Sequence, residues 1–186
     1  MTGAFPQVLS SVDLKAWIEE NRHFFDPPYK TSRVLAHHNE LFVMILHGPN
    51  ERLDFHREAG EEFFQQIYGD IELHLKPEGE RRQVVTIREG EIFVCPAGLA
   101  HSPRRGTGTW GLVIERKRKP DEPDEFLWFC ENCDAKVHSQ SVSQENVAGQ
   151  VRNLYESFNA NPVMRSCKAC GYVFPVAPLA ERLGFL

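Results

Sequence analysis

The chain has 186 residues, of which 41% are hydrophobic, and its 21 basic and 26 acidic side chains give a net charge of -5. This length supports one well-packed core and a small appended module, not two full domains. The acidic balance, without a basic stripe between aromatic residues, argues against a nucleic acid partner. The first ten residues lack the features of a signal peptide, and no apolar run approaches the ~18 residues that span a bilayer. We therefore expect a cytoplasmic protein without a membrane partner.

A short amphipathic helix is expected near the N-terminus. Ser10 is a candidate N-cap, and Asp13 follows three residues later in a capping-box position. Four apolar side chains then share one face of a 3.6-residue repeat: Leu14, Trp17, Ile18 and Phe25. The pair Pro27-Pro28 should end the helix. We assign residues 1–32 to an N-terminal helical segment that packs on the outside of the main core.

Between Arg33 and Arg116 the apolar pattern changes to short runs that are typical of strands. The runs are rich in Ile, Val, Leu and Phe: 34–35, 41–46, 53–56, 62–67, 71–75, 83–87, 92–95 and 112–116. Turn-forming Gly, Pro, Asn and Asp separate them, which indicates a closed antiparallel sandwich or barrel. We assign residues 33–118 to this barrel. Gly111, Val113 and Glu115 share one face of the last run, and the pattern does not decide whether that face or the opposite one is interior.

Two histidines and one glutamate of this region form a candidate metal site. His56 precedes Glu62 across a turn, and His101 follows a segment rich in turn residues. A single histidine in a β core is usually structural, so the hypothesis depends on all three occurring together. Two imidazoles and one carboxylate leave coordination positions open, which is typical of non-heme Fe(II) oxygenases.

The spacing of these residues resembles the two cupin motifs. The second motif is matched by Gly90-x5-Pro96-x-Gly98-x2-His101. The first is resembled by Gly48-x5-Asp54-x-His56-x5-Glu62-x6-Gly69. Asp54 stands where the first motif has its leading histidine, and Arg105 where an asparagine closes the second. The resemblance implies an all-β protein, a cupin double-stranded β-helix barrel with the metal inside.

Longer strings resemble the 3-hydroxyanthranilate 3,4-dioxygenase family. They are Gly48-Pro49-Asn50-x-Arg52-x-Asp54-Phe55-His56, Glu61-Glu62-Phe63-Phe64-x-Gln66-x2-Gly69-Asp70, Ile87-Arg88-Glu89-Gly90-Glu91-x-Phe93, His101-Ser102-Pro103-x-Arg105 and Gly111-Leu112-Val113-Ile114-Glu115-Arg116. The resemblance covers residues 13–174. It implies an Fe(II)-dependent ring-cleaving dioxygenase of the kynurenine pathway. Its product, 2-amino-3-carboxymuconate semialdehyde, cyclises to quinolinate, the precursor for NAD biosynthesis. Whether the role here is biosynthetic or catabolic is left open.

The same resemblance implies a role for individual residues. The catalytic iron is matched by His56, Glu62 and His101. Substrate binding and catalysis are matched by Arg52, Arg105 and Glu115. The pocket lining is matched by Phe64, Pro103 and Thr31. Two guanidiniums clamp a substrate carboxylate in a planar, charge-assisted way, and Glu115 can accept the phenolic proton.

Departures from the family pattern leave the substrate open. Thr31 stands where the family has an asparagine, and Tyr29 replaces a small apolar neighbour. A related aminophenol or catechol carboxylate is therefore an alternative substrate. Two further alternatives are a cupin isomerase or hydrolase that uses zinc or manganese without oxygen, and a non-catalytic cupin that binds a small carboxylate. The intact set of three ligands counts against the last.

Residues 119–186 form a C-terminal extension with its own metal signal. Residues 116–124 are charged and broken by proline, which indicates a linker. Four of the five cysteines form two C-x-x-C pairs: Cys130, Cys133, Cys167 and Cys170. In the cytoplasm such pairs favour a tetrahedral zinc or iron site over disulfides. The knuckles resemble the rubredoxin-like site of bacterial and fungal family members, which are typically dimers. We expect a structural site, a helix between the knuckles and a homodimer.

Overall fold

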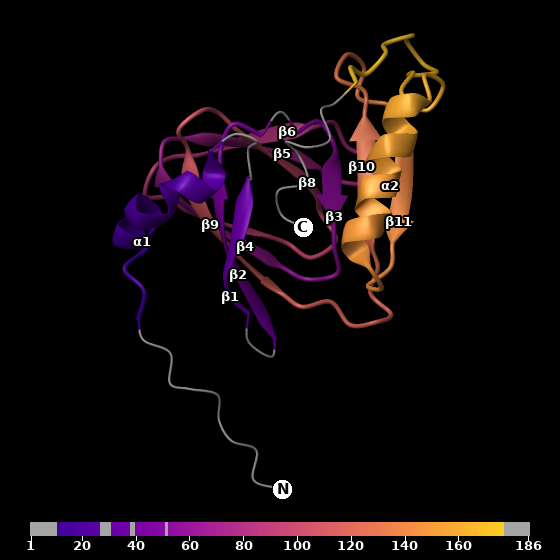
Figure 1. Ribbon diagram of the computed structural model, residues 1–186. Coiled ribbons are helices and arrows are strands. Elements are labelled where there is room, and N and C mark those ends of the chain that lie inside the picture. The colour runs from indigo at the N-terminus through magenta and orange to yellow at the C-terminus, as the bar shows by residue number, and fades with distance from the viewer. Residues whose placement is uncertain (1–10, 27–30, 38–39, 51, 177–186) are drawn as a thin grey trace, which may run out of the picture.

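The computed structural model describes residues 11–26, 31–37, 40–50 and 52–176, and Figure 1 shows its fold. The elements are, in chain order, α1 (Leu14–Asn21), the 3-10 helix η1 (Arg22–Phe25), β1 (Ser32–His37), β2 (Leu41–His47), β3 (Phe55–Arg57), β4 (Glu62–Tyr68), β5 (Ile71–Lys76), β6 (Gln83–Ile87), β7 (Ile92–Cys95), β8 (Ala100–Arg105), β9 (Trp110–Arg116), β10 (Asp124–Phe129), β11 (Lys136–Val142) and α2 (Val147–Ala160).

The strands form two antiparallel sheets that face each other. One sheet has the order β1-β2-β9-β4-β7, and the other has the order β11-β10-β3-β8-β5-β6. Eight of these strands, β2 to β9, follow the order of a jelly roll, which is the architecture of cupins. The structure therefore confirms the predicted all-β double-stranded β-helix, with a helix before it and a four-cysteine group after it.

The interior of the barrel is defined by the alternation along β4 and β9. Phe64 lies opposite Val113, and both belong to the apolar cluster that is buried between the sheets. Leu112 instead packs with Ile18 of α1 on the outer face of the same sheet. Since side chains two residues apart share a face, Glu115 points inward with Val113. This settles the choice between faces that the sequence left open.

The N-terminal helix begins later than the sequence predicts. α1 starts at Leu14 because Asp13 is its N-cap, and the Asp13 carboxylate accepts from the backbone N–H groups of Lys15 and Ala16. Ser10, the predicted cap, lies outside the described residues, as does Tyr29. Within the described ranges, no helix is long and apolar enough to cross a membrane.

β8 is the barrel strand that the sequence did not predict, because Pro103 interrupts its pattern. In an antiparallel strand the N and C=O of one residue point to the same neighbour. The Pro103 carbonyl accepts from the Asn50 side chain, so its nitrogen also faces that side, where β3 has ended. β3 and β8 pair only at His56 and His101. The missing N–H therefore removes no bond to β5, which explains how a central strand accommodates proline.

The C-terminal extension continues the second sheet. β10 pairs with β3 and β11 pairs with β10, so sheet hydrogen bonding crosses the boundary expected at residue 118. The predicted helix between the knuckles is α2, which covers the outer face of these strands (Figure 1). Trp128 of β10 stacks on Phe158 of α2 with ring centroids 4.3 Å apart. These residues belong to a separate apolar core that holds the extension against the barrel.

Candidate active site

Three strands bring the predicted metal ligands together inside the barrel. His56 lies on β3, Glu62 begins β4 and His101 lies on β8. One donor atom of each lies within 4.8 Å of the other two. Glu62 and His101 are buried, with exposed fractions of 8% and 2%. The two sheets therefore supply two imidazoles and one carboxylate to a single point.

Contacts of Nδ1 fix the orientation of the His101 ring. Nδ1 of His101 lies 2.9 Å from the carbonyl oxygen of Leu99 and 3.4 Å from Sγ of Cys95. His101 donates from Nδ1 to that carbonyl and from Nε2 to Oε2 of Glu62, which lies 2.5 Å away. Loss of the Nε2 proton would free this nitrogen to bind a metal. Burial opposes the charge of Glu62, but His101 outweighs it and lowers the pKa of Glu62 to about 2.

Both predicted arginines line two cavities, neither of which is lined by His56, Glu62 or His101. The charge of Glu62 nevertheless acts on both guanidiniums. A cavity of about 50 Å³ is lined by Thr31, Leu46, Asn50, Arg52, Pro103, Arg105 and Tyr155. A larger cavity of about 580 Å³ shares Asn50, Arg52 and Arg105 with it. The guanidiniums therefore lie between an inner recess and a wider opening, which is the position needed to hold an anionic group.

Each arginine is held by a neighbour. Arg52 Nε donates to Asp54 at 2.9 Å, and this ion pair, despite the burial of Arg52, raises the pKa of the guanidinium. Arg105 Nη1 donates to Gln66 Oε1 at 3.0 Å, and its backbone N–H donates to Asn50. Burial lowers the pKa of Arg105 to about 10, so it stays charged at neutral pH. Asp54, which replaces a metal ligand of the cupin motif, thus positions Arg52.

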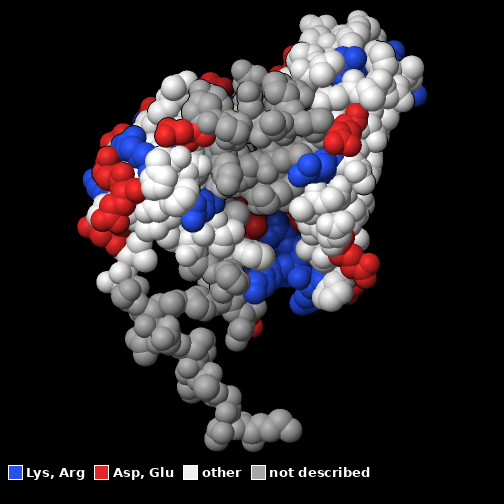
Figure 2. All heavy atoms as spheres, viewed as in Figure 1, with Lys and Arg blue, Asp and Glu red and all other residues white. Residues whose placement is uncertain are grey.

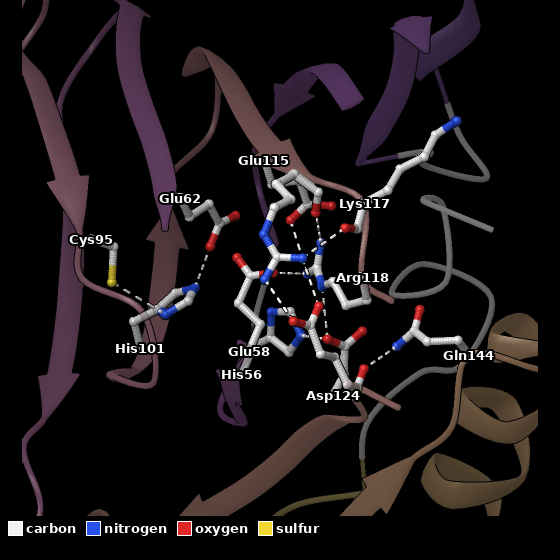
Figure 3. A network of polar contacts seen from close by, with 12 residues as sticks. His56, Glu58, Glu62, Cys95, His101, Glu115, Lys117, Arg118, Asp124 and Gln144 are labelled. Carbon is white, nitrogen blue, oxygen red and sulfur yellow. Dashed lines mark hydrogen bonds and ion pairs between the residues drawn. The ribbon is translucent and has the colours of Figure 1, made fainter. Parts of the chain in front are cut away.

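Glu115 lies close to the metal donors and next to further acidic residues. Its register partner across β4 and β9 is Glu62, and one carboxylate oxygen each of Glu58, Glu62 and Glu115 fall within 4.8 Å of one another. Burial and the nearby Glu62 charge raise the pKa of Glu115. Arg118 donates to Glu115 Oε2 at 3.1 Å, and Figure 3 shows its guanidinium among these carboxylates.

The structure groups most of the predicted site residues, but not all. Thr31, Arg52, Pro103 and Arg105 share the smaller cavity. Phe64 and Glu115 do not line it. Phe64 is buried in the barrel core with its ring 5.9 Å from that of His101.

Several residues near the site were not predicted. They are Leu46, Asn50, Glu58, Gln66, Arg118, Asp124 and Tyr155. Asn50 and Gln66 occur in the strings that resemble the family, which is the signal that points to them. Arg118 and Asp124 lie in a segment whose charges read as a solvated linker. In Figure 2 basic side chains gather in a hollow where, in Figure 1, the chain passes from β9 to β10.

The four predicted cysteines also converge. Sγ of Cys130 lies 3.5 Å from Sγ of Cys170, and Sγ of Cys133 lies 3.6 Å from Sγ of Cys167. A disulfide would require about 2.05 Å. Tetrahedral coordination with metal–sulfur bonds of about 2.3 Å places sulfurs about 3.8 Å apart. The backbone N–H of Tyr172 lowers the pKa of Cys170 to about 6, whereas burial raises the pKa of Cys130. Despite the backbone N–H of Ala135, the hydrogen bond with Cys170 raises the pKa of Cys133 to about 12. Binding of a metal to all four thiolates would therefore release protons.

Comparison with known proteins identifies the family. The family model for 3-hydroxyanthranilic acid dioxygenase matches residues 7–159. The 3-hydroxyanthranilate 3,4-dioxygenase of Bacillus thuringiensis (strain Al Hakam) is 41% identical over 169 residues, which cover 91% of this chain and 94% of the relative. The corresponding enzyme of Jannaschia sp. (strain CCS1) is 40% identical over 168 residues, covering 90% and 92%.

A solved cupin-2 domain protein from Shewanella frigidimarina aligns with a TM-score of 0.45 and 20% identity, covering 54% of this chain and 92% of that one. The family resemblance predicted from the sequence motifs is confirmed by the family model and by the full-length relatives. This chain belongs to the 3-hydroxyanthranilic acid dioxygenase family.

Proposed function

We propose that this protein is an Fe(II)-dependent 3-hydroxyanthranilate 3,4-dioxygenase, which consumes O2 and forms 2-amino-3-carboxymuconate semialdehyde. The observation that carries the proposal is the convergence of His56, Glu62 and His101 at one point, with the buried Arg105 and the partly buried Arg52 nearby. Family membership supports the reaction and the small aromatic substrate.

The donor atoms fit a ferrous ion. Within the described part of the chain, Nε2 of His56 is buried and lacks a hydrogen bond of regular geometry, and Oε2 of Glu62 is buried with Nε2 of His101 2.5 Å away. Leaving a buried polar atom without a hydrogen bond is costly, and a metal held by these three residues would satisfy the His56 nitrogen. Two imidazoles and one carboxylate suit non-heme iron and leave positions open. When bound, ferrous iron supplies the redox chemistry that joins O2 to the aromatic ring.

The arginines bind and orient the substrate in this proposal. Arg52 and Arg105 face the same two cavities, so both can donate to one carboxylate. Charge-assisted bonds from a planar guanidinium fix direction as well as position. Gln66 and Asn50 hold Arg105 in turn. The clamp therefore presents the hydroxyl and amino groups of the ring toward the metal donors.

Glu115 moves a proton in this proposal. Its inward position on β9 places it beside the metal donors, opposite Glu62. A raised pKa makes its carboxylate a stronger base than an exposed glutamate. An oxygen of Glu115 accepts the proton of the substrate hydroxyl as the substrate binds, and returns it when the product is formed.

Anaerobic loading with ferrous iron, followed by 3-hydroxyanthranilate and then air, tests the proposed function. We expect a new absorbing semialdehyde that fades as it cyclises, and consumption of one O2 per substrate. Turnover without oxygen by zinc- or manganese-loaded protein would indicate an isomerase or hydrolase instead. Turnover only with another aminophenol or a catechol carboxylate would change the substrate, and binding without turnover would contradict catalysis.

A substitution at Gly111 tests the role of Arg105 in substrate binding. A Cβ at this position would lie 2.7 Å from Nη1 of Arg105 and 2.9 Å from Oε1 of Gln66. The substitution Gly111→Ala should displace the guanidinium and raise the KM for 3-hydroxyanthranilate about tenfold, since loss of one charge-assisted bond costs about 1.5 kcal/mol. Steady-state kinetics measure this. Gly60→Ala is the control, because its Cβ would come no closer than 3.7 Å to Arg116. An unchanged KM in Gly111→Ala would contradict the role of Arg105.

We also propose that the four cysteines hold a second iron or a zinc as a structural site. Four thiolates close a tetrahedral shell and leave no position for substrate. The first knuckle is tied to the barrel through Glu131, which pairs with Arg82 and Arg104. The site therefore fastens the extension that packs beside the catalytic barrel.

Removal of a cysteine ligand should lower the stability of the protein and leave its kcat unchanged. Cys133→Ser should release one metal per chain and lower the Tm by more than about 8 °C. A structural zinc site contributes on the order of 10 kcal/mol, and a loss of about 4 kcal/mol already corresponds to roughly 8–16 °C in a domain of this size. Metal analysis and calorimetry measure both changes. The kcat per bound catalytic iron should stay within twofold at a temperature where the variant is folded. A parallel loss of kcat at full iron occupancy would show that the four-cysteine site takes part in the reaction.

The proposal also includes a cytoplasmic homodimer with segments 1–32, 33–118 and 119–186. Exposed apolar side chains on β6 and β7, each the edge strand of one sheet, support an interface between copies: Val84, Ile92 and Val94, with exposed fractions of 51%, 60% and 50%. Light scattering of the purified protein tests this assembly.

A further inference from the structure

Arg118 is an arginine with a buried side chain that contacts three carboxyl groups from three parts of the chain. Its Nε donates to Asp124 at 2.9 Å and its Nη2 donates to Glu115 at 3.1 Å. Nη2 also forms a close ion pair with Glu58. Figure 3 shows the guanidinium between these groups, with His56 beside them. One cation therefore links β9, the segment after β3 and the start of β10.

The geometry leaves the guanidinium no freedom to turn. Nη1 of Arg118 donates to the backbone carbonyl of Arg116 at 3.0 Å, so all three nitrogens have partners. The Arg118 side chain is 6% exposed, and the side chains of Glu58, Glu115 and Asp124 are 2%, 13% and 10% exposed. Buried ion pairs of this kind resist rearrangement, because removing one member leaves uncompensated charge.

The positive charge of Arg118 is in contact with Glu115, the residue proposed to move the proton. Glu115 lies near both Glu58 and Glu62. Burial raises the pKa of Glu58 to about 9, so the like charge that repels the Glu115 carboxylate at neutral pH is that of Glu62. Among the described residues, the cation that forms a hydrogen bond with the Glu115 side chain is Arg118. This ion pair offsets the repulsion and ties the Glu115 carboxylate to the guanidinium.

The linker thus contains a structural element of the active site. Asp124, which closes the linker, accepts from Arg118 and has Oδ1 3.5 Å from Nε2 of His56. The same guanidinium therefore connects Glu115 on one side with the neighbour of a proposed metal ligand on the other. A role limited to packing would not require contacts with both.

We propose that Arg118 is a positioning residue that holds the Glu115 carboxylate in the orientation needed for proton transfer to and from the substrate. This inference rests on the proposed function. A displacement of about 1 Å of a catalytic group costs on the order of 100-fold in rate, and general base catalysis contributes about 100-fold or more. The effect should therefore appear in kcat, because Arg52 and Arg105, not Arg118, line the substrate cavities.

Kinetics of Arg118→Ala and Arg118→Lys test the inference, after wild-type protein has been shown to open the ring. We expect kcat to fall at least 30-fold in Arg118→Ala and about tenfold in Arg118→Lys, whose single ammonium cannot serve three carboxylates at once. The KM should change less than threefold, and guanidinium chloride at about 20 mM should restore kcat of Arg118→Ala at least fivefold. Arg116→Gln is the control, because Arg116 pairs with Glu122 outside this cluster, and its kcat should stay within twofold.

A double-mutant cycle shows whether Arg118 acts through Glu115. In a Glu115→Gln background, Arg118→Ala should lower kcat by less than threefold further, because the positioned group is already gone. A binding measurement that needs no iron completes the test: the Kd of metal-free Arg118→Ala for 3-hydroxyanthranilate should stay within threefold of the wild-type value.

The outcomes separate the two proposals. If wild-type protein does not open the ring, the proposed function fails. If wild-type protein is active and Arg118→Lys keeps full kcat, the positioning role fails. It also fails if the losses in kcat are additive with Glu115→Gln, or if they only follow the loss of folded protein and iron without rescue by guanidinium. Should Arg118→Ala not fold, Arg118→Lys alone decides, since it keeps the buried positive charge.

Discussion

Glu62→Ala should lower ring-opening activity at least 1,000-fold and remove the catalytic iron. The carboxylate is buried in contact with His101, and it is the anionic member of the proposed ligand set. Its loss leaves two imidazoles, too few to hold a labile ferrous ion or to fix its geometry. Metal analysis should show one metal per chain in place of two, because the four-cysteine site is intact.

Glu61→Ala is the matched control for this change. Glu61 is the preceding residue and is exposed to solvent, so its replacement removes the same charge from the same turn. We expect activity and metal content within twofold of the wild-type values. Equal loss in both variants, or full activity in Glu62→Ala, would contradict the assignment of Glu62 as a ligand.

Arg105→Ala should reduce kcat/KM for 3-hydroxyanthranilate about 100-fold, mainly through KM. The loss of a hydrogen-bonded charge pair of about 3 kcal/mol corresponds to this factor. Arg105 remains charged at neutral pH because its pKa, lowered by burial, is still about 10. Arg105→Lys keeps the charge but loses the planar fork, so an intermediate loss of about tenfold is expected.

The substrate without its carboxylate provides the control. With 2-aminophenol, the kcat/KM of the same Arg105 variants should differ from the wild-type value by less than threefold, because this compound has no carboxylate for Arg105 to bind. Parallel kinetics with the two compounds measure this ratio. An equal loss with both would show that Arg105 maintains the structure of the site and does not recognise the carboxylate.

Much of the fold was predictable because the barrel follows simple local rules. Turn residues separate short apolar runs, and seven of the strands β1–β9 can be recognised in this way together with a partial β3. β8 could not, because Pro103 contradicts a central strand when pairing is unknown. Its tolerance depends on where β3 ends and on the Asn50 side chain. Both depend on the tertiary structure, which no local sequence pattern reveals.

The candidate site likewise contains residues that the sequence predicts and residues that it does not. His56, Glu62 and His101 were predictable because residue type and motif spacing together indicate metal binding, and the structure brings them together. Arg118 was not predictable, since it lies in a run of basic residues that resembles solvated surface. Only the folded chain shows that it turns inward to Glu115.

A crystal structure of the iron-loaded protein with 3-hydroxyanthranilate, prepared without oxygen, tests the central claim most directly. We predict an anomalous peak at the iron absorption edge between His56, Glu62 and His101, with the substrate carboxylate on Arg52 and Arg105. Iron held by other residues, or a substrate bound away from the two arginines, would contradict the account.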